Sequence, residues 1–229
     1  MINWQAAQMR LAERGYAPGN PDGVPGPRTY TALHAWAAGR KADAAIALRG
    51  RVAAERFAEY GMTTAPRIAE FIAQCANETG GFRRFVENLN YSARAMLALW
   101  PTHFTPEQAR AAVGNPIEIA GRAYGGRMGN APWPSHDGYT YRGRYDLQLT
   151  GKGNYRWFGD LIGIDLVSDP DAAPPEAGPL IALAYFRQFH VNAAVDRGDF
   201  TEARRLTNGG RIGLAHVATL RNHILEIFA

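Results

Sequence analysis

The chain has little of several features that would narrow its class at once. A single cysteine, Cys75, among 229 residues allows no internal disulfide, which suits a reducing compartment, and we expect a small buried side chain there. No apolar run approaches membrane-spanning length, which excludes a spanning helix. Residues 1–5 lack the charged start and apolar stretch of a secretory signal, so we expect synthesis in a cytoplasm without a signal peptide.

Lysine is also scarce. Lys41 and Lys152 are the only two, so the net charge of +4 comes almost wholly from arginine. The charges are scattered without a basic block or helix, so we expect no nucleic-acid partner, although the mild positive balance favours an anionic polymer such as a cell wall. The six histidines show no metal-ligand spacing, and we expect no metal site.

What the chain does have is an amphipathic pattern that ends in a carboxylate. A helix is predicted whose start Thr63 or Thr64 can cap. Its apolar face carries Ile68, Phe71, Ile72 and Cys75. At about 100° per residue Glu78 lies in line with Phe71, so its carboxylate leans over the apolar face. Burial of a carboxyl there without a cation would raise its pKa and keep it protonated near neutrality, as a general acid requires.

A second carboxylate, Glu87, follows nine residues after Glu78, with Gly80 and Gly81 between them. The glycine pair can end the helix and turn the chain back, which would bring the two carboxylates to opposite sides of a cleft. Two carboxyls so held, one in an apolar setting and one more solvated, are the working groups of a glycoside hydrolase. The alternative interpretation is a helix-end charge and a surface residue.

The first forty residues favour a separate small module. Short helices, one from Trp4 to a break at Gly15 and one at 29–36, flank a proline- and glycine-rich stretch at 18–27. This order resembles the peptidoglycan-binding repeat. The residues that carry the resemblance are Leu11, Gly15-Tyr16, Asp22-Gly23, Gly26-Pro27, Thr29, Ala32-Leu33 and Trp36. Without the resemblance, the segment is a capped helical hairpin with two tryptophans in its core. A composition change at 40–43 divides a helical wall-binding module, 1–42, from a larger domain, 43–229.

Residues 88–155 predict further helices and a hairpin. Helical patterns cover 94–99 and 106–113, and Thr105 can cap the second. A turn at Asp137-Gly138 and the short alternation up to Arg144 predict a small β-hairpin. Amides, hydroxyls and aromatics are interleaved with glycine along this stretch, an inventory that suits a saccharide cleft, although each residue taken alone is typical of turns.

Several separated motifs then recur in one order and resemble the family 19 glycoside hydrolases, which include chitinases and phage endolysins. They are Asn77-Glu78-Thr79-Gly80-Gly81-Phe82, Glu87-Asn88-Leu89-Asn90-Tyr91-Ser92, Tyr141-Arg142-Gly143-Arg144, Gln148-Leu149-Thr150-Gly151, Asn154-Tyr155 and Asn208-Gly209-Gly210. The resemblance covers about residues 45–225. It implies a mainly α fold, a lysozyme-like helical catalytic domain with a small β-hairpin beside the cleft.

The resemblance also implies roles for single residues. Glu78 matches the family's general acid, Glu87 its general base, and Thr150 the hydroxyl that helps to hold the attacking water. The positions that match residues binding the sugar, or supporting the acid and base, are Tyr91, Gln148, Asn154, Tyr155 and Asn208. The departures from the family pattern are Asn77 for a common histidine, Tyr145 and Asp146 after the Arg-Gly-Arg run, and Val217 for a common arginine, for which Arg221 could substitute.

The sequence therefore predicts an endolysin that hydrolyses β-1,4 bonds of peptidoglycan strands by an inverting acid/base mechanism and so lyses bacterial cells. No metal or organic cofactor is needed for this chemistry. The alternatives are a chitinase and a wall-binding protein with an inactive hydrolase domain. We expect a monomer without stable membrane insertion, made in the host cytoplasm and acting on the wall after release, with a holin if it is phage-derived. The helical stretch 220–228 is expected to pack on the core.

Overall fold

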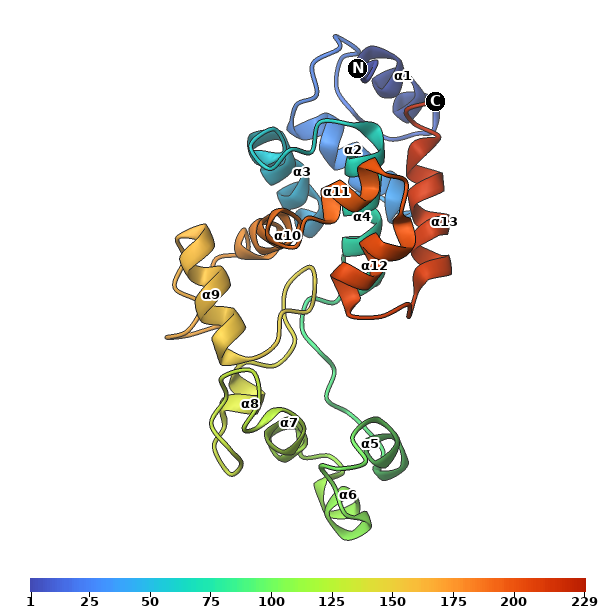
Figure 1. The fold of residues 1–229 in the computed structure, drawn as a ribbon. Coiled ribbons are helices and arrows are strands. Elements are labelled where there is room, and N and C mark those ends of the chain that lie inside the picture. The colour runs from blue at the N-terminus through green and yellow to red at the C-terminus, as the bar shows by residue number, and fades with distance from the viewer. The chain divides into compact units, whose positions relative to one another are not determined.

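The computed structural model describes all residues, 1–229, and is mainly α-helical. It contains thirteen helices and, in place of named strands, two isolated antiparallel bridges, which confirms the predicted fold class. The chain divides into two compact units (Figure 1). The first unit comprises residues 1–84 and 175–229, and the second unit comprises residues 85–174. None of the helices is both long and apolar enough to span a membrane.

The first unit is built around α4 (Ala65–Thr79), the predicted amphipathic helix. Thr64 caps it by accepting a bond from the Arg67 amide, and Gly80 ends it in the left-handed conformation with φ of 59°. Two thirds of its residues are buried, because α13 packs along it and α2 and α11 also contact it. The other helices of the unit are α1 (Trp4–Glu13), α2 (Pro27–Ala37), α3 (Ala44–Arg56), α10 (Ala177–Gln188), α11 (Val191–Asp196), α12 (Phe200–Asn208) and α13 (Leu214–Leu225).

The N-terminal helices are packed into this unit. Helix α2 lies so close to α3 that a Cβ on Gly50 would come within 2.1 Å of Oγ1 of Thr31, so this crossing requires glycine. The Trp36 indole donates a 2.9 Å hydrogen bond to the carbonyl of His223 on α13 and stacks on its ring. Residues 1–42 therefore share one compact unit with α3, α4 and α13, while the predicted domain boundary at 42 stays a prediction.

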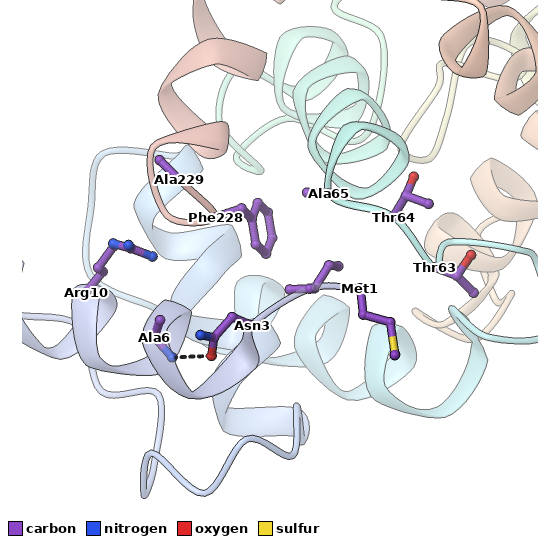
Figure 2. Close-up of a pocket in the computed structure, with 10 residues that line it drawn as sticks. Met1, Asn3, Ala6, Arg10, Thr63, Thr64, Ala65, Phe228 and Ala229 are labelled. Atoms are coloured by element: carbon purple, nitrogen blue, oxygen red, sulfur yellow. Dashed lines mark hydrogen bonds between the residues drawn. The ribbon is translucent and has the colours of Figure 1, made fainter.

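The two ends of the chain lie beside the first turn of α4. Trp4 meets the ring of Phe228 edge-on at 5.6 Å. Figure 2 shows Phe228, Arg10 and Thr64 around a cavity of about 420 Å³ that these three segments enclose. Ile224 and Ile227, near the C-terminal end, are fully buried, which confirms the expectation that this helical stretch packs on the core.

The proline- and glycine-rich loop between α1 and α2 is organised by one buried amide, Gln8. Its Nε2 donates to Oδ1 of Asp22, to the carbonyl of Val24 and to Oγ1 of Thr29, and its Oε1 accepts from the Gly23 amide. All of these distances lie between 2.9 and 3.2 Å. The Asp-Gly turn of the supposed repeat thus has a structural explanation, because a buried amide must find partners for its donors and acceptor.

The helices of the second unit are α5 (Ala93–Leu99), α6 (Pro106–Ala112), α7 (Pro116–Tyr124), α8 (Asp137–Thr140) and α9 (Lys152–Ile162). The capping box of Thr105 and Gln108 confirms the predicted start of α6. The hairpin prediction is corrected in two respects. The helical turn that includes Asp137-Gly138 continues to Thr140, into the expected alternation, and the sheet is reduced to bridges of Arg144 with Val86 and with Leu149.

Candidate active site

Glu78 occupies the last turn of α4, and its side chain is 17% exposed. The condition of burial without a cation, under which its pKa would rise, is not met. Arg204 Nη1 donates to Oε1 of Glu78 at 2.7 Å, and Asn77 Nδ2 donates to the same oxygen at 3.0 Å. Both bonds reach Oε1, and Oε2 takes part in neither of them. Asn77, where the family often has histidine, thus contacts the carboxylate directly.

Glu78 is the last of three polar side chains spaced four residues apart on α4. The other two are Glu70 and Gln74, both fully buried. Gln74 Nε2 donates to Oε1 of Glu70 at 2.7 Å, while its Oε1 accepts from Arg204 Nη1 at 2.6 Å. Arg221 closes the row by donating to Oε2 of Glu70 at 3.2 Å. The row therefore alternates charge and amide, and each buried polar group has a partner.

Two arginines from distant segments supply the positive charge of this row. Arg204 comes from α12 and is 1% exposed, and its Nε also donates to the carbonyl of Ile212 at 2.7 Å. Arg221 comes from α13 and lies 3.6 Å above the ring of Phe200. Arg221, the candidate to substitute for the arginine that the family often has at the position of Val217, bonds Glu70 and not Glu78. Burial raises the pKa of Glu70, although Gln74 and Arg221 oppose the shift.

Glu87 lies in the second unit, where tyrosine hydroxyls and a backbone amide hold its carboxylate. Tyr124 donates to Oε1 at 2.7 Å and Tyr91 donates to the same oxygen at 3.4 Å, while the Gly143 amide donates to Oε2 at 3.3 Å. Burial and the charge of Glu87 raise the pKa of both tyrosines, which keeps them protonated as donors. The carboxylate is thus stabilised by neutral donors, a setting that suits a base.

The backbone around Gly143 places Glu87. The backbone amide of Glu87 donates to the Gly143 carbonyl at 2.8 Å, next to the bridge between Val86 and Arg144. A Cβ on Gly143 would lie 3.3 Å from Cβ of Glu87 and 3.0 Å from Oε1 of Gln148. The glycine of the Arg-Gly-Arg run therefore allows the carboxylate and the Gln148 amide to approach one backbone position closely.

The predicted water-holding residue, Thr150, lies on the segment that leads into α9. Its hydroxyl donates to the carbonyl of Gln148 at 2.9 Å, and its own carbonyl accepts from Asn154 Nδ2 at 2.7 Å. Gln148 is half-buried, has a φ of 54°, and its Nε2 donates to the carbonyl of Tyr145 at 3.4 Å. Asn154 thus supports the backbone of Thr150, and each of the three assigned roles stays a prediction.

Tyr155 is fully buried, and its expected role in binding the sugar or supporting the acid and base stays a prediction. Its hydroxyl donates to the carbonyl of Arg142 at 2.6 Å and accepts from Arg144 Nη1 at 3.3 Å. Arg144 is held in turn by Asp171, whose Oδ1 accepts from Nη2 at 2.6 Å. Asn208, the last residue of α12, is exposed in the first unit. No group of three histidine, cysteine, aspartate or glutamate side chains converges on a possible metal position.

No family model matches the chain. The chain is 35% identical over 147 residues to a glycosyl hydrolase family 19 domain-containing protein of Haemophilus influenzae, over 64% of this chain and 72% of that protein. It is 32% identical over 129 residues to an endochitinase of Persea americana and 28% identical over 181 residues to one of Arabidopsis thaliana. These alignments cover 56% and 76% of this chain and 33% and 52% of the endochitinases.

Among solved structures, chitinase C of Streptomyces griseus is 18% identical with a TM-score of 0.46, over 99% of this chain and 76% of that one. A family 19, class IV chitinase of Zea mays is 17% identical with a TM-score of 0.44, over 87% and 78%. The sequence relatives define the class of protein, a glycoside hydrolase. On the match with the Haemophilus protein, the chain belongs to glycosyl hydrolase family 19.

Proposed function

We propose that the protein is an endolysin that hydrolyses the β-1,4 glycosidic bonds of peptidoglycan. The observation that carries the proposal is the contrast between its two carboxylates. Glu78 is held through one oxygen by Arg204 and Asn77, whereas Glu87 is held through both oxygens by neutral donors. Family membership supplies the reaction class, the cleavage of a bond between sugars.

In this mechanism Glu78 is the general acid. Its Oε2 protonates the departing glycosidic oxygen, and the charge that remains on the carboxylate is stabilised by the guanidinium of Arg204, 2.7 Å from Oε1. Because Arg204 is already fixed by Gln74 and by the Ile212 carbonyl, little reorganisation is needed when the charge develops.

Glu87 is the general base of the proposal. It takes a proton from the water that attacks the anomeric carbon, with Thr150 helping to orient that water, and the sugar is released with inverted configuration. An inverting mechanism requires room for this water, about 6.5–9.5 Å between the two carboxyl groups. As Glu87 takes the proton its charge is lost, while Tyr124 and Tyr91 keep its oxygens oriented. The base thus acts from a prearranged position.

The substrate class rests on two separate observations. Resemblance of residues 1–42 to a wall-binding repeat favours peptidoglycan, and the positive net charge suits an anionic wall. Plant relatives that are named endochitinases favour the second candidate, chitin. Both polymers present β-1,4-linked sugars to the same acid and base, so the residues of the catalytic site do not separate them.

We propose that a lytic enzyme of this kind reaches the wall after release from the cytoplasm.

One comparison tests the proposal. Bacteria stripped of their outer membrane are incubated with the purified protein while turbidity is followed, and colloidal chitin is incubated in parallel while soluble sugars are measured. Clearing with little release from chitin supports an endolysin, and release without clearing assigns a chitinase. If neither activity appears and purified sacculi still retain the protein, the chain is a wall-binding protein and the proposed function is wrong.

A further inference from the structure

The turn that follows Glu78 has an unusual backbone. Helix α4 ends at Thr79, and Gly80, Gly81 and Phe82 follow with φ of 59°, 73° and 61°. Glycine adopts positive φ freely, but Phe82 carries a side chain that disfavours this region. Such a residue persists only where its surroundings hold it. The contacts around Phe82 therefore determine how the end of α4 is kept in place.

A single guanidinium holds the carbonyls of this turn. Arg40 donates from Nε to the carbonyl of Gly81 at 3.3 Å and from Nη2 to that of Phe82 at 3.1 Å. Its Nη1 donates to Oδ2 of Asp43 at 2.8 Å, which fixes the third arm of the fork. The side chain is only 16% exposed, so water competes weakly for these bonds. Arg40 lies at the end of the N-terminal segment, far from the helix in sequence.

Side chains of α2 and α3 contact the Phe82 ring. It is 1% exposed, and the ring of His34 on α2 lies 5.4 Å away, centroid to centroid. The guanidinium of Arg49 lies 5.7 Å from its centre. Gly81 approaches the backbone of Ala38, since a Cβ on it would lie 3.8 Å from the Ala38 carbonyl oxygen. Helix α2 and the residues after it thus form the surface on which the turn rests.

That surface is itself rigidly attached. Gly50 allows α2 to touch α3 without space for a side chain, and Trp36 is bonded to α13, which packs along α4. The acid-bearing end of α4 is consequently fixed from two directions, by Arg204 on the side chain of Glu78 and by Arg40 on the turn behind it. Misplacement of a reacting group by about 1 Å can lower a rate roughly 10²-fold.

We propose that Arg40 is a positioning residue for the reaction, and that the N-terminal segment acts through it to hold the general acid in place. The inference rests on the proposed function in taking Glu78 as the acid. It gives residues 1–42 a task inside the catalytic machinery, whether or not they also bind the wall. Arg40 acts through the turn at 80–82 and does not touch the substrate in this account.

The test compares Arg40→Ala and Arg40→Lys with Arg197→Ala, which removes an exposed arginine of the same unit. Turnover of soluble peptidoglycan fragments is measured well below the melting temperature. We expect Arg40→Ala to lower kcat at least tenfold with KM within twofold, and methylguanidinium to restore part of kcat. Arg40→Lys should recover less than full activity, because an ammonium lacks the fork that spans two carbonyls. A kcat equal to that of Arg197→Ala would overturn the inference.

Hydrogen exchange gives a readout that needs no substrate. The amides of Gly81, Phe82 and Arg84 are bonded within the turn, to Ala76 O, Thr79 Oγ1 and Thr79 O. Arg40→Ala should accelerate exchange in a peptide covering 76–84 at least tenfold, with exchange elsewhere in α4 unchanged. Unchanged exchange there would refute the positioning role. If the wild-type protein cleaves no glycan, the proposed function fails separately, and this measurement alone decides whether Arg40 holds the turn.

Discussion

Arg204 binds Glu78 and Gln74 through one nitrogen, with Nη1 2.7 Å from one Oε1 and 2.6 Å from the other. Loss of the guanidinium should leave the carboxylate that forms on proton transfer without its strongest donor. We expect Arg204→Gln to lower kcat on the order of 10²-fold, as for other donors that stabilise developing charge. The neighbouring Arg205→Gln is the matched control, because Arg205 pairs only with Glu202 at the surface. Equal kcat values for the two variants would contradict the role of Arg204.

Glu78→Gln should abolish lysis while the fold and wall binding are retained. The amide has a similar volume and can still accept from Arg204, but it has no proton to give the leaving group. Loss of a general acid typically costs about 10²–10⁴-fold in rate, so trace activity is consistent. Lysis within a factor of two of wild type, with an unchanged circular dichroism spectrum, would refute the assignment.

Tyr124 should matter to the base through its hydroxyl alone. Tyr124→Phe removes the 2.7 Å bond to Glu87 and is expected to lower kcat by roughly tenfold. Glu87→Gln should lose more, and Thr150→Val less, because the threonine only orients water. Tyr139→Phe, on a half-buried ring of the same unit, is the control.

Proton NMR of the first product should show the inverted anomer, whereas a retained anomer would make Glu87 a nucleophile.

Burial of Glu70 predicts a pH dependence of stability. Its pKa in the folded state lies above the ordinary value of 4.5, so the folded protein binds more protons than the unfolded chain at intermediate pH. Its contribution to the free energy of unfolding is therefore complete below 4.5 and declines as pH rises through the folded pKa. Denaturant titrations of wild type and Glu70→Gln over pH 4 to 8 should show this decline only in wild type. Parallel curves would contradict it.

Deletion of residues 1–42 separates a packing role from a binding role. The segment contributes Leu11 and Leu33, both fully buried, and loss of each large core side chain costs about 2–5 kcal/mol. For a domain of this size each kcal/mol shifts the melting temperature by about 2–4 °C, so we expect a fall of at least about 8 °C and the loss of every activity together. Unchanged melting with weaker binding to sacculi would instead favour a separable wall-binding module.

Local signals made much of the first unit predictable. The cap at Thr64, the apolar face of α4 and its end at Gly80 are each encoded within a few residues, and the structure contains all three. Spacing and the family motifs also predict the two carboxylates as acid and base, and these roles stay predictions. The contact that fixes Glu78 could not be predicted, because Arg204 lies 126 positions later in the chain and no periodicity relates the two residues. The four-residue spacing of Glu70, Gln74 and Glu78 on one helix face was the available signal, and it was missed.

The loop after α1 shows a second limit of sequence interpretation. Its Asp-Gly and Gly-Pro turns favoured a binding repeat, yet Gln8 accounts for the Asp-Gly turn from inside the fold. A turn motif indicates backbone geometry equally well whether it serves a ligand or a buried amide. Likewise, the alternation near Arg144 indicated a hairpin, but the pairing is limited to single bridges, since residues 137–140 are helical and Tyr145 and Gln148 have positive φ of 71° and 54°.

The discontinuous first unit has a consequence for synthesis. Glu78 and its helix leave the ribosome early, but Arg204 follows 126 residues later, roughly 6–25 s at ordinary rates of elongation. Arg221, which neutralises the buried Glu70, comes later still. Until then the nascent chain carries Glu70 and Glu78 without either arginine. Glu78 therefore gains its cation only after the chain has been extended through α12, and a product truncated before Arg204 lacks this ion pair.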